Sequence, residues 1–225
     1  MRIALLLLVL LTACGRPLSP GETALAQSLF GDELDPKPVR IASFKALSKV
    51  TAKRPKRPRI ACREKIWPEP KSDIVTTFTA AFVTFNRINI ADELYRDDYL
   101  PDHPERISLP SAMLIGHELT HVWQWQNRDR TGYHPLKAAA EHSPGTDPYL
   151  LDFEQQNFLS HGFEQQSAIV EEYVCCRALD PNGARTQRLH QMLSSTFPVQ
   201  RLEDRLSSVE IGLPWAGVQP KGICS

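Results

Sequence analysis

Apolar residues recur at helical spacing in two long stretches of the chain. The first stretch begins at a capping residue, Ser108, has Leu109 and Pro110 in its first turn, and ends at the polar and charged residues from Asn127 onward. The second stretch runs from residue 163 to residue 179 and stops before an Asp-Pro-Asn-Gly turn signal. The pattern therefore predicts two long helices, and the first is expected to be buried because its flanks are apolar and uncharged.

A shorter helix is predicted near the start of the chain, from residue 19 to residue 30. Ser19 is its expected N-cap, Pro20 its first residue, and Gly31 lies just past its end. Residues 39–44 follow an Asp-Pro-Lys-Pro turn and are predicted to form a strand.

The stretch from residue 74 to residue 90 fits two kinds of element. Its β-branched and aromatic residues favour a strand, whereas Asp73 could cap a helix. We predict a helix that leads into a strand near residues 87–90. The segments 59–71 and 97–104 contain prolines among charged residues and are predicted to be loops.

In the C-terminal half of the chain, the predicted elements rest on turn signals and on weaker apolar periodicity. Residues 134–147 are predicted to form a long polar connection between the two long helices. Short helices are predicted at 185–195 and 199–208, and the proline- and glycine-rich end beyond Gly212 is predicted to be irregular. The length suits one domain with a sizeable core, placed at residues 20–225. The expected fold class is α+β, mostly helical, with a small sheet beside the first long helix.

The charge of the chain gives no reason to expect a nucleic-acid partner. Lysine and arginine total 26 residues, and aspartate and glutamate also total 26. One basic run, Lys-Arg-Pro-Lys-Arg-Pro-Arg at residues 53–59, contains two prolines that oppose a helix. It is predicted to be a solvated loop, with contact to anionic lipid or an envelope polymer as the alternative.

The N-terminus has the features of an export signal. The apolar run at residues 3–11 is too short to span a bilayer, which needs about twenty residues. The Leu-Thr-Ala-Cys sequence that ends at Cys14 resembles the lipobox of bacterial lipoproteins. That resemblance implies a signal peptide at 1–13, a lipid-bearing Cys14 and a short tether at 14–19; a plain signal peptide is the alternative. The residue after the cysteine is glycine, which implies attachment to the outer membrane, facing the periplasm.

The cysteine count agrees with export to an oxidising compartment. Assigning Cys14 to lipid leaves an even set, Cys62, Cys175, Cys176 and Cys224. A bond between the two neighbouring cysteines would be strained. We therefore expect one of them to pair with Cys62 and the other with Cys224. A cysteine zinc site is the competing use, but the chain has no C-x-x-C pair.

The first long helix contains the spacing H-E-x-x-H, at His117, Glu118 and His121. Two histidines four residues apart lie on one helical face, so both imidazoles can bind one metal ion. The glutamate between them stays free for proton transfer. These polar groups would be costly in an apolar helix unless a metal or hydrogen bonds satisfied them. The alternative is a core helix with two incidentally spaced histidines.

The sequence Gly-His-Glu-Leu-Thr-His-Val-Trp-Gln around this motif resembles the zinc helix of zincin-type metallopeptidases. The likeness is to bacterial members whose helix has the pattern H-E-L-x-H-V-x-Q. The longer metzincin pattern is absent, because Gln124 and Asn127 stand where it has glycine and histidine. The resemblance therefore implies a gluzincin-like domain, one zinc ion, a third ligand from a glutamate on a later helix, and a strand before the zinc helix that holds an extended substrate.

The second long helix offers that glutamate. Helical spacing places Glu164, Ala168, Glu171 and Cys175 on one face. The run Glu-Gln-Gln-Ser-Ala-Ile-Val-Glu-Glu-Tyr, which begins at Glu164, resembles the glutamate helix of the same metallopeptidases. On that resemblance Glu164 is the third zinc ligand, and Glu171 can hydrogen-bond a ligand histidine. The alternatives are solvated glutamates or a third ligand from Glu171, His161, Glu154, His134 or His142.

The expected function is zinc-dependent hydrolysis of peptide bonds in the bacterial cell envelope, with Glu118 activating a zinc-bound water. Such a reaction also needs an oxyanion donor. The candidates are Tyr133, His134, His161 and Tyr173. The expected partners are a peptide or protein substrate and, through the lipid anchor, the membrane. Two alternatives are a cell-wall amide hydrolase with the same zinc chemistry and a non-catalytic, zinc-binding envelope lipoprotein.

Overall fold

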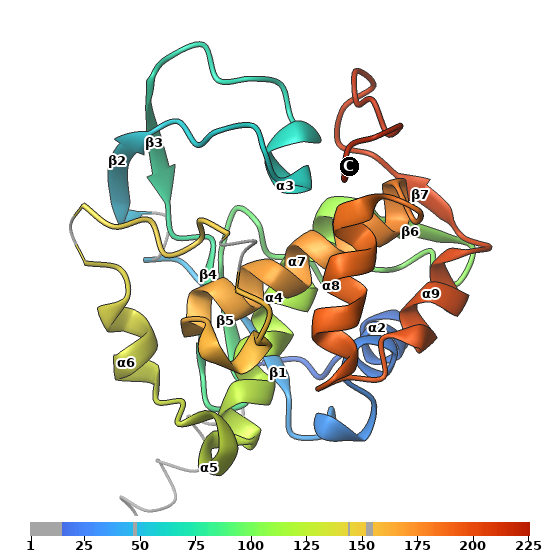
Figure 1. The fold of residues 1–225 in the computed structure, drawn as a ribbon. Coiled ribbons are helices and arrows are strands. Elements are labelled where there is room, and N and C mark those ends of the chain that lie inside the picture. Colours follow the sequence, from blue (N-terminus) through green and yellow to red (C-terminus); the bar gives the residue numbers. More distant parts are fainter. Residues whose placement is uncertain (1–14, 47–48, 144, 152–154) are drawn as a thin grey trace, which may run out of the picture.

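Two long helices form the centre of the molecule (Figure 1). The computed structural model describes residues 15–46, 49–143, 145–151 and 155–225. Helices α4 (Leu109–Gln126) and α7 (Phe163–Leu179) lie side by side and make the most extensive contact between any two described elements. Both helices lie where the apolar spacing predicts them. The fold is α+β and mostly helical, as expected.

Helix α4 is buried on nearly all sides, as the apolar, uncharged residues that flank its histidine motif predict. Ser108 occupies its N-cap position, although the serine side chain makes no capping hydrogen bond. Gly116 faces Leu29, Val170 and Val174, and a Cβ at this position would lie 3.4 Å from the leucine side chain. Side chains of α2 and α7 thus pack directly over this position of α4.

Helix α2 (Pro20–Phe30) packs against α4 and has the predicted boundaries. The Ser19 side chain accepts a hydrogen bond from the Glu22 amide, while the Glu22 carboxylate accepts one from the Ser19 amide, which forms a capping box. Arg16 pairs with the same buried carboxylate at 2.7 Å. These bonds fix the start of the described chain on the domain.

A three-stranded sheet packs against α4, in the order β1 (Arg40–Phe44), β5 (Arg87–Ala91), β4 (Ala81–Thr84). Strand β1 is parallel to β5, and β4 is antiparallel to it. The central strand carries buried isoleucines because both faces of the sheet are covered there. The strands predicted at residues 39–44 and 87–90 are confirmed.

The helix predicted at the start of the stretch 74–90 is wrong. Strand β3 (Ile74–Phe78) pairs in antiparallel register with β2 (Thr51–Pro55), and β4 follows it. The β-branched residues outweigh the capping signal of Asp73, because the partner strand supplies a surface on which they pair. The basic run is therefore a loop only after Pro55, since its first residues belong to an exposed edge strand.

Two of the predicted loops contain short helices. Helix α3 (Cys62–Lys65) lies within the segment 59–71, and α6 (Pro135–Ala140) lies within the connection 134–147. The segment 97–104 has no helix or strand, as predicted. The other described elements are η1 (Gly31–Glu33), β6 (Arg106–Ser108), α5 (Arg128–Thr131), η3 (Phe158–Ser160), α8 (Ala184–Ser194), α9 (Gln200–Leu206) and β7 (Glu210–Gly212).

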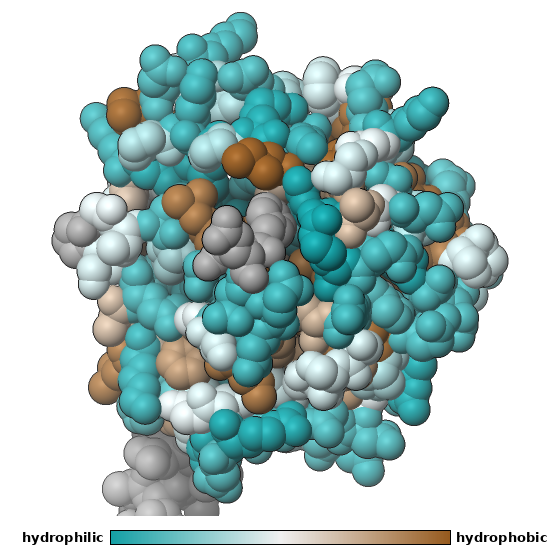
Figure 2. All heavy atoms as spheres, in the orientation of Figure 1, coloured by the Kyte–Doolittle hydropathy of each residue, from teal (hydrophilic) through white to brown (hydrophobic). Residues whose placement is uncertain are grey.

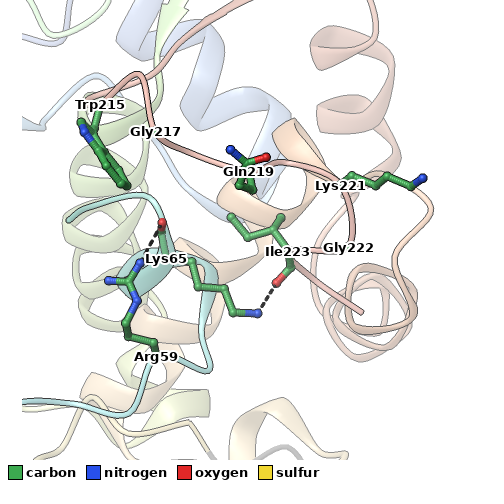
Figure 3. Close-up of a pocket in the computed structure, with 8 residues that line it drawn as sticks. All are labelled: Arg59, Lys65, Trp215, Gly217, Gln219, Lys221, Gly222 and Ile223. Atoms are coloured by element: carbon green, nitrogen blue, oxygen red, sulfur yellow. Dashed lines mark hydrogen bonds between the residues drawn. The ribbon is translucent and has the colours of Figure 1, made fainter. Parts of the chain in front are cut away.

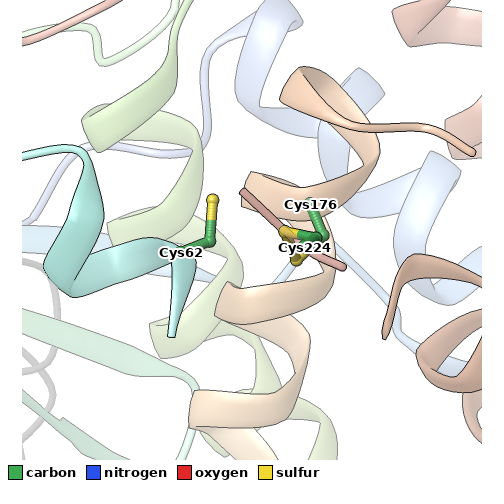
Figure 4. A group of neighbouring side chains, drawn as sticks. All are labelled: Cys62, Cys176 and Cys224. Carbon is green, nitrogen blue, oxygen red and sulfur yellow. A yellow bond between two sulfur atoms is a disulfide. The ribbon is translucent and has the colours of Figure 1, made fainter. Parts of the chain in front are cut away.

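Two disulfides fasten α7 to distant parts of the chain. Cys62 of α3 bonds Cys175. Cys176 bonds Cys224 near the C-terminus, and Figure 4 shows this second bond. The expectation that neighbouring cysteines take separate partners is confirmed. The predicted signal peptide and the lipid-bearing Cys14 lie outside the described residues. Among the helices that the structure does describe, none is long and apolar enough to cross a membrane.

The surface is mostly hydrophilic on the face shown in Figure 2, where apolar residues are scattered between hydrophilic ones, as is usual for a folded protein surface.

Candidate metal centre

Three predicted ligands come together between the two central helices. His117 and His121 project from successive turns of α4, and Glu164 stands in the first turn of α7. The Glu164 Oε2 atom lies 3.5 Å from His117 Nε2 and 3.3 Å from His121 Nε2. One potential ligand atom from each residue falls within 4.8 Å of the others, and all three residues are buried. This group could hold a metal ion.

Each imidazole is oriented by an acceptor on its far side. His121 Nδ1 lies 2.9 Å from Gln124 Oε1, and His117 Nδ1 lies 3.3 Å from Glu171 Oε2. If each Nδ1 carries the proton and donates it, the Nε2 lone pairs face Glu164, which is the tautomer that a metal site needs. Glu171 thus lies where it can hydrogen-bond a ligand histidine, which is the role that the sequence suggests for it.

Sequence reasoning missed the role of Gln124. This glutamine is fully buried, and its Nε2 donates to the Phe163 carbonyl and to Gln166 Oε1, both at 3.0 Å. Gln166 in turn donates to the His161 carbonyl at 2.9 Å. The available signal was the position of Gln124, three residues after His121 in the H-E-L-x-H-V-x-Q pattern and therefore on the same helical face.

The polar atoms at the centre fit a zinc ion. Glu118 Oε2 and Glu164 Oε2 are buried and have no hydrogen-bond partner among the described residues. Burying a carboxylate oxygen between two imidazole lone pairs is costly unless a cation lies between them. Two histidine nitrogens and one glutamate oxygen form a donor set that zinc takes in hydrolases.

The charges favour a cation at this point. Burial lowers the pKa of His117, but the carboxylates of Glu164 and Glu171 outweigh it and raise that pKa to about 10. Burial also acts to raise the pKa of Glu164, yet His121 and His117 hold it well below its usual range. Burial raises the pKa of Glu118. A carboxylate with a raised pKa can accept and return a proton near neutral pH.

The connection between α4 and α7 brings further groups to the centre. Its described part within residues 132–151 is called the flanking segment below. The ring of Tyr149 lies 5.8 Å from that of His117, and the ring of Tyr133 lies 6.1 Å from that of His121. Burial raises the pKa of both tyrosines, and the Glu164 and Glu118 carboxylates raise it further. Both hydroxyls are therefore protonated donors at neutral pH.

His142 also belongs to the flanking segment. Its Nε2 lies 3.1 Å from Glu164 Oε1, and its side chain is 42% exposed. It thus contacts the second oxygen of the glutamate whose first oxygen faces the two ligand imidazoles. The sequence suggested His142 only as a metal ligand. It suggested no role for Tyr149, because no apolar periodicity marks the position of a loop residue.

Other candidates from the sequence lie elsewhere. The Tyr173 hydroxyl contacts His190 Nδ1 at 2.8 Å. His134 caps α6, where its Nδ1 accepts a hydrogen bond from the Leu136 amide. His161 is buried, with its Nε2 3.3 Å from the Gln155 carbonyl. Glu154 lies outside the described residues. The structure thus brings together His117, His121, Glu164 and Glu171 and gives Tyr173 and His134 other partners.

Two further groups among the described residues do not offer comparable chemistry. The sulfurs of Cys62, Cys176 and Cys224 lie near one another, but all three form disulfides and supply no thiolate (Figure 4). The hollow in Figure 3 is lined by the cations of Arg59 and Lys65, which donate to backbone carbonyls. It shares no residue with the metal centre.

Comparison with known proteins adds one likeness. No protein family and no curated protein matches the chain. Among solved structures, the chain is similar to the effector domain of Pseudomonas aeruginosa VgrG2b, with 21% identity over 83% of this chain and 86% of that one, at a TM-score of 0.49.

Proposed function

We propose that this protein is a zinc-dependent hydrolase of peptide bonds of the gluzincin type. The observation that carries the proposal is the convergence of His117 Nε2, His121 Nε2 and Glu164 Oε2 at one buried point. The free carboxylate of Glu118 stands on the same helix, between the two histidines. Such a set suits hydrolysis better than a purely structural site, which usually has four protein ligands.

His117, His121 and Glu164 would hold the ion. When bound to three such ligands, zinc acts as a Lewis acid and lowers the pKa of a water molecule toward about 7. Glu118 serves as the general base, because burial raises its pKa and so improves its match to proton transfer near neutral pH. The same carboxyl group then returns the proton to the leaving amine.

Two tyrosines whose rings lie beside the ligand imidazoles are the candidates to stabilise developing negative charge. The ring of Tyr149 lies beside His117, and the ring of Tyr133 lies beside His121. Both tyrosine hydroxyls stay protonated at neutral pH. A neutral donor aimed at the reacting carbonyl oxygen stabilises the transition state. We propose these tyrosines, rather than Tyr173, as the oxyanion donors.

We further propose that the enzyme works in the bacterial cell envelope, attached through lipid on Cys14, on a peptide or protein substrate. Two disulfides in a chain of this size support an oxidising compartment. The short link between Cys14 and α2 would keep the domain close to the membrane.

The first test is the zinc content of the purified protein and of the variants His121→Ala and Glu164→Ala. We expect about one zinc per chain in the parent and loss of zinc in both variants. Hydrolysis of casein and of cell-wall fragments is then measured for the parent and for Glu118→Gln. Cleavage of wall fragments alone would favour the cell-wall amide hydrolase. A parent that takes up no zinc after reconstitution would rule out the proposal.

A further inference from the structure

Arg63 joins a distant segment of the chain to the metal centre. Its Nη1 donates to Glu171 Oε2 and its Nη2 donates to the backbone carbonyl of Tyr149, both at 3.1 Å. The same oxygen of Glu171 lies 3.3 Å from His117 Nδ1. One mostly buried guanidinium therefore touches the carboxylate that orients a ligand histidine and also the loop that carries a substrate-side tyrosine.

Helix α3, which carries Arg63, needs contacts with the rest of the chain to keep its position. Helix α3 has only four residues, and an isolated helix of this length is not stable in water. Besides the bonds that Arg63 itself makes, α3 is fixed on α7 by the disulfide between Cys62 and Cys175 and by the hydrogen bond from the Cys62 amide to Glu172 Oε1 at 2.9 Å. Figure 4 shows Cys62 on α3 next to α7. The position of Arg63 thus depends on the disulfide.

Arg63 supplies the opposite charge for the buried carboxylate of Glu171. Glu171 is a mostly buried carboxylate, and its partner His117 also contacts Glu164. An unpaired buried charge in that setting would be strongly disfavoured. The guanidinium of Arg63 supplies the opposite charge at 3.1 Å, while the same carboxylate oxygen lies within hydrogen-bond distance of His117 Nδ1.

We propose that Arg63 is a positioning residue for the metal centre and that the Cys62–Cys175 disulfide governs metal affinity through it. The proposal rests on the metal site of the proposed function. It assigns the two disulfides different roles: the first supports the centre, whereas the second secures the C-terminal tail to α7. Metal binding is then coupled to an intact first disulfide.

The first experiment compares zinc dissociation constants, from competition with a chelator, for the parent, Arg63→Met and Arg63→Lys. Replacing a group that supports a metal ligand typically weakens metal binding about 10- to 100-fold. We expect about a tenfold loss in Arg63→Met and a smaller loss in Arg63→Lys, because one ammonium can reach Glu171 but does not reproduce the fork that also holds the Tyr149 carbonyl. In a Glu171→Ala background, Arg63→Met is expected to cause no additional loss.

The second experiment separates the disulfides. Cys62→Ser with Cys175→Ser is expected to weaken zinc binding about as much as Arg63→Met. The matched control, Cys176→Ser with Cys224→Ser, is expected to keep the parent affinity, although both pairs lower thermal stability. Circular dichroism at the binding temperature establishes that each variant is folded.

Three results would overturn the inference. Parent-like zinc affinity in Arg63→Met would remove the role of Arg63 and leave the metal site intact. An undiminished loss in the Glu171→Ala background would make Arg63 a general support of the fold. Equal effects of the two disulfide pairs on zinc affinity would remove the link through α3. A parent that binds no zinc would instead mean that the proposed function itself has failed.

Discussion

The helices that hold the metal ligands and the flanking segment that lies over them are fixed by different forces. Helices α4 and α7 pack through buried apolar side chains. The flanking segment is held mainly by polar contacts. Asp147 pairs with Arg57 at 2.6 Å, and the Glu141 carboxylate accepts hydrogen bonds from the backbone amides of Phe163 and Glu164, both at 2.9 Å.

This difference separates two tasks of the site. Metal ligands must be held within a fraction of an ångström, which a close-packed core can do. Groups that contact a substrate must admit it and release it, which suits a loop held by exchangeable polar bonds. Tyr149 and His142 belong to the second kind, although they contact residues of the first.

The largest effect is expected from Glu118→Gln, which replaces a carboxylate on the ligand-bearing helix α4 with an amide of the same shape. The amide cannot act as a general base, so kcat should fall by about a thousandfold. Zinc content should stay at the parent level, because Glu118 is not one of the three ligands. Peptide-cleavage kinetics and zinc analysis of the same preparation check both statements. Retention of activity would place the base elsewhere.

Gln124→Leu tests whether the buried amide network supports the centre. Leucine fills a similar volume but cannot accept the hydrogen bond from His121 Nδ1, so zinc affinity should fall by about 10- to 100-fold. Chelator competition measures the change. Gln126→Leu is the matched control, because Gln126 bonds to Asp35 and Asn86 and touches none of the metal ligands. Equal losses in the two variants would point to damage to α4 as a whole.

The sequence predicted helices α4 and α7, which hold the metal ligands, much better than the flanking segment. The bounds of α4 and α7 follow from the apolar spacing within each helix and from cap and turn signals next to its ends. His117, Glu118 and His121 are set by spacing within one helix, whereas Glu164 required the resemblance to a glutamate helix. The disulfide partners of α7 could be narrowed because adjacent cysteines cannot bond without strain.

The remaining parts depend on contacts between residues far apart in the sequence. The strand β3 was predicted as a helix because the pairing with β2 that stabilises it is not visible in its own residues. Tyr149 lies in a loop and Arg63 in a four-residue helix, and no apolar periodicity in either segment predicts that these residues reach the site. Gln124 could have been found, because its position relative to His121 is fixed by the helix.

Tyr149→Phe sharpens the comparison from the side of the flanking segment. Removing one neutral donor should lower kcat by at least about tenfold, with zinc content and thermal stability close to the parent. Tyr133→Phe is tested in parallel, since both rings flank the ligand imidazoles. In Tyr173→Phe, which removes the bond to His190 away from the metal centre, activity should be unchanged. If only the Tyr173 variant lost activity, the oxyanion donor would have to be reassigned.

The smallest effect is expected from Asp147→Asn, which weakens the polar hold on the flanking segment. Burial acts to raise the pKa of Asp147, but the hydrogen bonds and charge of Arg57 outweigh it and lower the pKa below its usual value. Because the folded-state pKa is the lower one, this group stabilises the protein above the unfolded pKa of about 3.9, and that contribution is lost as the pH falls through the folded value. We expect the substitution to cost less than about 1 kcal/mol at neutral pH, because the pair is partly exposed. Urea unfolding at pH 7 and at pH 3 should then show a smaller loss of stability on acidification in the variant than in the parent. An identical pH dependence in both proteins would mean that this ion pair does not hold the flanking segment in solution.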